Sequence, residues 1–317
     1  MRSARSHPLP LLAIAGPTGV GKTATAVSLA SRMPLEVISA DSRQVYRGMD
    51  VATGKPSPEE RRAVVHHLID VVDPDDRYQA ARFRADAVRL IEDIHARGRL
   101  PVVVGGTGLY IRALLRGLDP APPADPAFRE TLELVAAHEG SVALHRRLTE
   151  KAPEMARRLH PNDRVRIVRA LELVRAGSPV GDAQVRWRGG DSDYRTVYVG
   201  LTMPRAALAE RLVTRARQMA ADGLAQEVRT LLERGYDPSL PAMRGIGYRQ
   251  FVDAAAGRLA PEEALRLMER DTIRYARRQW TWFTREPDIQ WIDVLADGSE
   301  DAARRIERMV KDGGLLA

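Results

Sequence analysis

Short apolar runs alternate with stretches of helical periodicity through the first third of the chain. Residues 23–32 and 80–97 carry the 3.6-residue spacing of amphipathic helices, and Gly98 follows the second stretch as a stop signal. Three apolar runs have the length of buried strands: 11–15, 36–40 and 100–104. Because strands that alternate with helices form parallel sheets, the pattern predicts an α/β fold whose sheet is flanked by helices.

The alternation stops at a proline-rich segment, residues 119–126, and residues 127–175 then carry several helical patterns without a strand. A second breaker spans residues 186–191. After it we expect strands at 194–201 and 289–292 and helices at 205–221, 224–234, 248–256, 261–284 and 301–311. We therefore predict a core made of residues 1–120 and 193–317, and an all-helical insertion domain at 121–192.

Size and composition exclude several classes of protein. The chain has 317 residues, 44% of them apolar, which is enough to bury a sizeable core. No apolar run approaches 18 residues, so we expect no membrane span. The absence of cysteine excludes disulfides, a thiolate nucleophile and cysteine-bound zinc. The basic N-terminal segment leads into a glycine-rich loop instead of a cleavage site, so we expect a cytoplasmic protein, and nothing demands more than a monomer.

The positive charge of the chain is unevenly distributed. The net charge is +7, and residues 141–188 alone carry +6, with ten arginines and one lysine against five acidic residues. Clustered positive charge indicates a polyanionic partner such as RNA. A solvated helix face would have the same composition, so charge alone leaves both interpretations open.

A glycine-rich loop follows the first predicted strand and precedes the first predicted helix. It fits the phosphate-loop pattern G-x-x-x-x-G-K-[ST] with the residues Gly16, Pro17, Thr18, Gly19, Val20, Gly21, Lys22 and Thr23. The amides of such a loop and the positive end of the new helix point at an anion. Lys22 adds a mobile cation and Thr23 offers a hydroxyl to Mg²⁺. We predict a polyphosphate site in a P-loop core, although the loop alone does not say which polyphosphate binds.

Polar residues follow the second predicted strand. Asp41 comes at its carboxyl end, where ligands of open α/β sheets bind, so we expect its carboxylate to face the phosphate loop. An aspartate there can accept a proton from an incoming nucleophile. A turn or helix-cap aspartate is the alternative. Ser42, Arg43 and Gln44 follow directly, and three adjacent hydrogen-bonding side chains suit the recognition of a base edge.

The third strand ends in small residues, Gly105-Gly106-Thr107-Gly108, which we interpret as room for the close approach of a ligand. A tight strand-to-helix turn is the alternative for the glycines, although it explains Thr107 less well. P-loop enzymes that hydrolyse ATP usually place a Mg²⁺-binding aspartate after such a strand, and none is present here. Simple ATP hydrolysis is therefore disfavoured. Trp280, Trp282 and Phe283 could stack on bases, but such clusters are more often core.

Taken together, these motifs resemble those of the tRNA dimethylallyltransferase (isopentenyltransferase) family. The resemblance covers roughly residues 11–285 and rests on motifs in the family's order at residues 16–23, 41–46, 48–50, 105–110, 160–163, 169–172 and 244–249. It implies a P-loop core with a helical insertion. It also implies transfer of a dimethylallyl group from dimethylallyl diphosphate to tRNA, at the exocyclic amine of the adenosine just 3′ of the anticodon.

The resemblance assigns roles residue by residue. It implies Asp41 as the general base, and it places Lys22, the loop amides, Thr18 and Thr23 around the diphosphate, with Thr23 near Mg²⁺. Arg215 is similar to the family's diphosphate-contacting arginine, with Arg211 and Arg217 as close competitors. The positions that match the family's contacts to the tRNA anticodon stem-loop are Asp41, Ser42, Arg43, Gln44, Thr107, Arg129, Val165, Arg166, Ile167, Val168, Arg169, Arg244, Gly245, Ile246, Gly247, Tyr248 and Arg249.

Two departures from the family pattern affect these expectations. Val165 stands where the family commonly has glutamine, so one polar contact to RNA is missing. The family usually has Gly-Thr-Ala-Lys-Pro where this chain has Ala-Thr-Gly-Lys-Pro at residues 52–56, which leaves the path of that loop open. Two other functions share the phosphate loop. A small-molecule kinase would consume ATP without needing the basic insertion, and a nucleotide-switched RNA-binding protein would leave Asp41 without a role.

Overall fold

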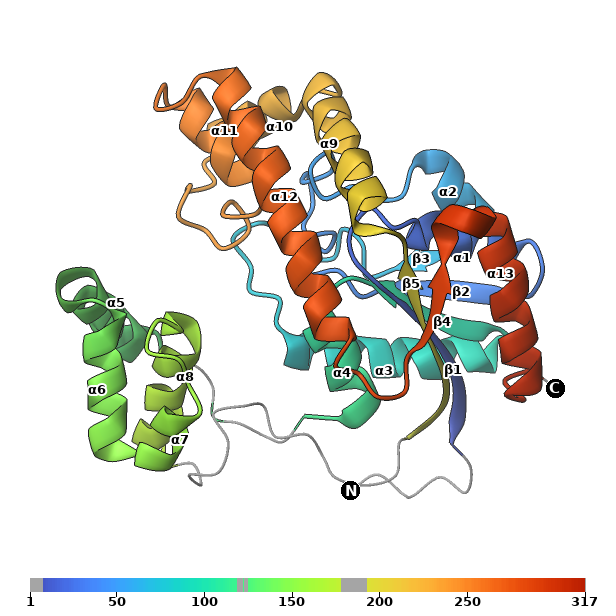
Figure 1. The fold of residues 1–317 in the computed structure, drawn as a ribbon, viewed down its shortest axis with the longest axis horizontal. Coiled ribbons are helices and arrows are strands. Elements are labelled where there is room, and N and C mark those ends of the chain that lie inside the picture. Colours follow the sequence, from blue (N-terminus) through green and yellow to red (C-terminus); the bar gives the residue numbers. More distant parts are fainter. Residues whose placement is uncertain (1–7, 119–121, 123–124, 178–192, 317) are drawn as a thin grey trace. The chain divides into compact units, whose positions relative to one another are not determined.

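The computed structural model describes residues 8–118, 122, 125–177 and 193–316, and it divides into two compact units (Figure 1). The first unit combines Met1–Leu115 with Asp191–Ala317, and the second is Arg116–Gly190. The division separates the same two parts of the chain that were assigned to core and insertion, with both boundaries a few residues earlier. The second predicted breaker, residues 186–191, lies outside the described residues.

The first unit is built on a parallel sheet whose strand order is β3-β2-β4-β1-β5-β6. The strands are β1 (Leu9–Ala15), β2 (Leu35–Ser39), β3 (His66–His67), β4 (Leu100–Gly105), β5 (Tyr194–Thr202) and β6 (Gln290–Asp293). The fold class predicted from the sequence is therefore confirmed. The two-residue strand β3 was not predicted, because a run of two histidines carries no apolar signal.

The sheet is buried on both faces, as strands of a parallel sheet usually are. Within β1, Leu11 and Ala13 point into one apolar cluster, and Leu12 and Ile14 point into the other. Helices α3 (Ala80–Ala96) and α4 (Gly108–Arg116) cover the first face, and α1 (Lys22–Ala30) and α13 (Val294–Asp312) cover the second (Figure 1). The central position of β1, between β4 and β5, fixes where its carboxyl end delivers the next loop.

Four further helices of this unit follow β5, and a short one follows β2. They are α2 (Pro58–Ala63), α9 (Arg205–Ala221), α10 (Leu224–Glu233), α11 (Tyr248–Ala255) and α12 (Pro261–Phe283). Figure 1 shows α9 and α12 side by side, and their backbones are in contact. A capping box at Ser57 and Glu60 starts α2, a helix that the apolar pattern missed because none of its side chains is buried. Helix α13 begins seven residues before its prediction and carries a kink at Gly298.

In its described residues, the second unit has four helices: α5 (Pro126–Glu139), α6 (Ser141–Lys151), α7 (Pro153–Arg157) and α8 (Arg164–Arg175). Asp125 caps α5, so the last proline of the predicted breaker becomes the first residue of a helix. Leucines and alanines from all four helices form a separate apolar core. Among the described residues, none of the helices of either unit has both the length and the apolar character needed to cross a bilayer.

Candidate active site

The phosphate loop joins β1 to α1 and has the backbone that its glycines predict. Gly16, Gly19 and Gly21 have φ angles of 142°, 79° and 109°, which L side chains rarely adopt. Gly21 is the N-cap of α1, and no side chain caps this helix. The first amides of α1 are therefore left for an anion in the loop. The side chain of Val20 is buried beneath the loop, so only its backbone can face a ligand.

Lys22 is the largely buried cation of this loop. Its Nζ donates to the carbonyls of Gly16, at 3.0 Å, and Pro17, at 2.8 Å. Burial lowers the pKa of the Lys22 ammonium to about 8, with a smaller contribution from Arg215 in the same direction, while the Asp41 carboxylate opposes the shift. Within the described residues Lys22 makes no ion pair, so its charge is poorly compensated until an anion enters the loop.

Three neighbouring strands carry the three segments of the site. Because β2, β4 and β1 are adjacent and parallel, their carboxyl ends lie at one edge of the sheet. Asp41 follows β2 and accepts a 2.8 Å hydrogen bond from the Arg43 amide, which fixes its carboxylate in a local turn. Thr107 follows β4, and its Oγ1 accepts a 3.0 Å bond from the Ser42 amide. Asp41 thus lies in the local turn that the alternative expected, and its role in a site stays a prediction.

The glycines after β4 serve a different purpose from the one expected. They were interpreted as room for a ligand, but protein atoms occupy the space beside each of them. A Cβ on Gly105 would overlap Ala40, one on Gly106 would overlap Gln279, and one on Gly108 would overlap Trp282. These glycines therefore let β2 and α12 approach the loop closely.

Two cavities meet at the predicted base. The loop cavity, of about 500 Å³, lies over the phosphate loop and is lined by Lys22, Thr23 and the segment 50–56. The helix cavity, of about 290 Å³, lies among α9, α11 and α12 and is lined by Ser42, Arg43, Tyr248 and Tyr275, among other residues. The residues that line both are Thr18, Asp41, Thr53, Arg215 and Met219.

The three arginines of α9 that competed for one role occupy different positions. Arg215 is largely buried, lines both cavities and lies 3.5 Å from Thr18 Oγ1 through its Nη1. Burial lowers its pKa, although it remains a cation. Arg211 lines only the loop cavity. Arg217 forms a 2.9 Å ion pair with Glu269 and lines neither cavity.

The loop that departs from the family pattern is held by hydrogen bonds. Gln44 Nε2 donates to Gly54 O at 3.0 Å, and Thr53 Oγ1 donates to Met49 O at 2.6 Å. Gly54 has φ +57°, and a Cβ there would lie 2.9 Å from Cζ of Arg215. The displaced glycine thus lets the Arg215 guanidinium pass close to the backbone.

The predicted segment 244–249 contributes to the helix cavity. Arg244, Gly245, Ile246, Tyr248 and Arg249 all line it. The exception is Gly247, which lies against Ala52, where a Cβ would come within 2.6 Å of the alanine methyl. Sequence reasoning missed Tyr275, on α12. It lines the same cavity, and burial, aided by the Asp41 carboxylate, raises the pKa of its hydroxyl to about 12.

The remaining predicted RNA contacts lie in the second unit and have unequal accessibility. Val165 is 81% exposed, and the Arg166 side chain is also exposed. Ile167 and Val168 are buried in the apolar core of this unit, so their side chains are unavailable to RNA, and their prediction as contacts is corrected to core positions. The helical period explains this outcome for Ile167, because residues two positions apart on a helix do not share one face.

Arg129 and Arg169 are engaged inside the second unit. Arg129 donates to both carboxylate oxygens of Glu172, at 3.0 and 2.7 Å, and Arg169 Nη1 lies 3.3 Å from the same group. The Glu172 side chain is only 2% exposed, and a buried carboxylate needs such partners. These two arginines therefore stabilise the unit, whether or not they also reach RNA.

The aromatic cluster near the end of α12 is mainly structural, as the sequence favoured. Phe283 is fully buried, and Trp282 packs against the Arg112 guanidinium at 4.3 Å from its ring centre. Trp280 lies 4.8 Å from Trp291, ring centre to ring centre. The cluster lines neither of the two cavities that meet at Asp41.

The described residues contain no group of three or more His, Cys, Asp or Glu side chains that could hold a metal ion. The loop cavity does offer the Thr23 hydroxyl and the Asp41 carboxylate. Mg²⁺ typically takes one or two protein oxygens and completes its shell with substrate phosphates and water. The donor set therefore fits a Mg²⁺ that arrives with a diphosphate, and it does not fit a resident protein-bound metal.

Comparison with known proteins shows similarity over most of the chain. Residues 44–286 match the model of a family described as IPP transferase, and residues 9–70 match one described as isopentenyl transferase. A tRNA dimethylallyltransferase from Thermomicrobium roseum is 48% identical over 307 residues, which are 96% of this chain and 92% of the relative.

Two solved structures are also similar to this chain over almost its whole length. The tRNA isopentenylpyrophosphate transferase of Bacillus halodurans is 39% identical with a TM-score of 0.71, and the match covers 96% of this chain and 98% of that one. A eukaryotic dimethylallyltransferase, described in crystallographic snapshots of its action on tRNA, is 26% identical with a TM-score of 0.78, over 96% of this chain and 79% of its own. The chain therefore belongs to the tRNA dimethylallyltransferase, or IPP transferase, family of prenyl-transferring enzymes.

Proposed function

We propose that this enzyme transfers a dimethylallyl group from dimethylallyl diphosphate to the exocyclic amine of the adenosine 3′-adjacent to the anticodon in tRNAs, releasing diphosphate. The observation that carries the proposal is the junction of the two cavities at Asp41, Thr18 and Arg215. A diphosphate in the loop cavity and a nucleobase in the helix cavity would meet there, beside a carboxylate. Family membership favours this function over the kinase and the nucleotide switch.

The cations of the loop cavity suit the leaving group. Breaking the allylic C–O bond leaves positive charge on the allyl group and negative charge on the diphosphate. Lys22, Arg215 and the amides of the phosphate loop are preorganised positive groups around that position. Because both cations are largely buried, their interaction with the developing charge is weakly screened. Mg²⁺ held near Thr23 by the diphosphate oxygens would supply further charge neutralisation.

Asp41 suits the acceptor. The lone pair of the adenine amine is delocalised into the ring, so the amine is a poor nucleophile until its proton is accepted. The Asp41 carboxylate lines both cavities and is oriented by the Arg43 amide. As the C–N bond forms, the proton passes from the amine to this carboxylate, a general-base effect of roughly 10²–10⁴-fold.

The helix cavity suits an extruded base. Its lining combines the rings of Tyr248 and Tyr275 with Arg43, Arg244 and other arginines. Aromatic and guanidinium groups are the usual partners of unstacked bases in RNA. Flipping a base costs a few kcal/mol, less in a loop than in a duplex. The exposed Arg166 of the second unit would help to offset this cost by binding the phosphates of the anticodon stem-loop.

A labelling experiment tests the proposal. The enzyme is mixed with radiolabelled dimethylallyl diphosphate, Mg²⁺ and unmodified tRNA, and the label is followed into the RNA. We expect label at one adenosine per tRNA and none in a matched tRNA with guanosine 3′ of the anticodon. Absence of label from the first tRNA, or ATP hydrolysis in a parallel assay, would contradict the proposal and favour one of the P-loop alternatives.

A further inference from the structure

Gln279 on α12 joins two segments of the site that are far from it in sequence. Its side chain is almost fully buried. Oε1 accepts a 2.9 Å hydrogen bond from the Thr18 amide of the phosphate loop, and Nε2 donates a 2.8 Å bond to the carbonyl of Gly106 after β4. Because one partner is a donor and the other an acceptor, only one orientation of the amide satisfies both.

The residue that Gln279 holds is the one at the junction of the cavities. Thr18 lines both, and its hydroxyl lies 3.5 Å from Nη1 of Arg215. Thr18 is thus held by Gln279 through its backbone and faces Arg215 through its side chain. The second partner is Gly106, and Gln279 passes close to its backbone. A Cβ at this position would lie 3.3 Å from Cδ of Gln279 and would overlap the amide nitrogen of that side chain.

We propose that Gln279 is a positioning residue for diphosphate: it fixes Thr18, and so the shape of the phosphate loop, against the end of β4. The same helix lines the helix cavity with Thr272, Tyr275 and Arg278. Helix α12 therefore contacts both the phosphate loop, where the diphosphate would bind, and the helix cavity, where the base would bind. The inference deepens the proposed function and depends on it only for the identity of the donor.

The chemistry of the amide makes the role separable from simple packing. Methionine has a similar shape but makes neither hydrogen bond. Ionised glutamate keeps an acceptor for the Thr18 amide, but it sets an oxygen against the Gly106 carbonyl and a negative charge beside the diphosphate. Protonated glutamate regains an O–H donor for the Gly106 carbonyl and keeps an acceptor for the Thr18 amide, so it can replace both hydrogen bonds of glutamine. A Gln279→Glu variant should therefore recover as the pH falls, whereas a packing defect would not.

Gln250 provides a matched control. It is also buried and also makes two hydrogen bonds, accepting from the Gly247 amide at 2.9 Å and donating to Asp271 at 3.0 Å. It does not touch the phosphate loop. We expect Gln279→Met and Gln250→Met to lose comparable thermal stability. Only the Gln279 variant should lose affinity for dimethylallyl diphosphate measured without tRNA, by about tenfold.

The experiment measures the dissociation constant of dimethylallyl diphosphate by calorimetry for the wild type and the three variants between pH 5 and 8. Gln279→Glu should bind about a hundredfold more weakly than the wild type at pH 8, with the ratio narrowing towards pH 5. Unchanged affinity in Gln279→Met, or a pH-independent ratio for Gln279→Glu, would overturn the proposal. These measurements do not involve tRNA, so a wild type that binds the donor without prenylating tRNA would refute the proposed function alone.

Discussion

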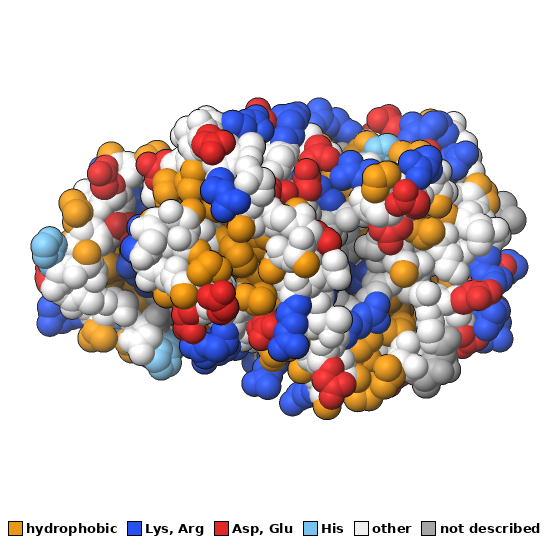
Figure 2. Space-filling view, turned by 90° about the horizontal axis from the view of Figure 1, so that it is seen from above, with side chains coloured by type: hydrophobic (Ala, Val, Ile, Leu, Met, Phe, Trp, Pro, Cys, Tyr) orange, Lys and Arg blue, Asp and Glu red, His pale blue; other side chains and the backbone are white. Residues whose placement is uncertain are grey.

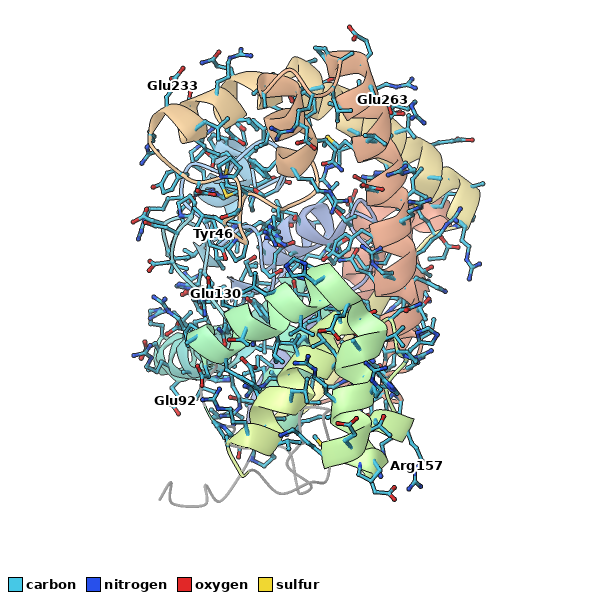
Figure 3. All side chains as sticks on the ribbon, turned by 90° about the vertical axis from the view of Figure 1, so that its left-hand side faces the viewer. Tyr46, Glu92, Glu130, Arg157, Glu233 and Glu263 are labelled. Carbon is cyan, nitrogen blue, oxygen red and sulfur yellow. The ribbon has the colours of Figure 1, made fainter. Side chains whose placement is uncertain are left out.

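The two units of the chain use positive charge in different ways. In the first, Lys22 and Arg215 are largely but not fully buried beside a cavity, and neither makes an ion pair within the described part of the chain. In the second, most arginines have carboxylate partners, such as Arg157 with Glu154 at 2.6 Å and Arg166 with Asp163 at 3.4 Å. Figure 3 shows Arg157 pointing outwards from α7.

The difference shows that the count of basic residues does not measure the charge available to a ligand. The basic segment 141–188 drew attention in the sequence, yet several of its arginines neutralise neighbouring acids. On the face shown in Figure 2, basic and acidic side chains are interspersed as well. Within the described residues Lys22 has no carboxylate partner, and it is the one charged residue between positions 8 and 31. Desolvation, more than number, therefore marks the site where an anion is most needed.

The largest effect is expected at Asp41, whose carboxylate lines both the loop cavity and the helix cavity. Asp41→Asn keeps an oxygen to accept from the Arg43 amide but cannot take a proton from adenine. We expect the single-turnover rate of transfer to fall roughly 10²–10⁴-fold while tRNA affinity is retained. Near-wild-type turnover by this variant would remove the general base from the mechanism.

The next effect contrasts two buried lysines. Lys22→Met should lower the rate of transfer by a hundredfold or more, about 3 kcal/mol, because a preorganised cation at the leaving group is lost. Lys55 is equally enclosed but is bound to Asp50 and Asp70. Lys55→Met should mainly lower the melting temperature. If both variants lost stability and activity in parallel, the contrast between paired and unpaired cations would fail.

The pH dependence of donor binding tests the same cation. Burial lowers the pKa of Lys22 to about 8, so its charge is present below pH 8 and is lost above it. Donor binding favours the charged form, and affinity should therefore fall by up to about tenfold for each pH unit above 8. Calorimetric titrations of the wild type and of Lys22→Met check this, since the affinity of the variant should not show the additional fall above pH 8.

The smallest effects on tRNA binding separate the exposed Arg166 of the second unit from Arg129, which is paired with the buried Glu172. The exposed Arg166–Asp163 pair costs little to exchange for a phosphate, so Arg166→Ala should weaken tRNA binding and reduce its salt slope by about 1. Arg129→Ala should instead destabilise the unit by about 3 kcal/mol, because it uncovers the buried Glu172 carboxylate. Charge reversal at Arg169 tests whether this arginine also contributes to the salt slope. Salt titrations and urea unfolding distinguish these outcomes.

Much of the fold followed from local pattern. The apolar runs located β1, β2 and β4 to within two residues, and the phosphate loop and Asp41 followed from their places at strand ends. Local pattern could not reveal that Gln279 bonds to Thr18, 261 residues away. It could not tell a glycine that admits a ligand from Gly106, which admits Gln279. Nor could it distinguish the exposed Val165 from the buried Ile167 as an RNA contact, because motif matching ignores which face of a helix a residue occupies.

The packing of α13 on α1 has a consequence for synthesis. The helix that opens at the phosphate loop has its apolar side covered by nearly the last residues of the chain, including Ile306 and Val310. At translation rates of about 5–20 residues per second, the interval between the synthesis of α1 and the synthesis of α13 is between about 10 and 60 s. During this interval its exposed leucine and alanine side chains are a natural target for a chaperone, and a ribosome that stops before α13 releases a chain that lacks a finished donor site.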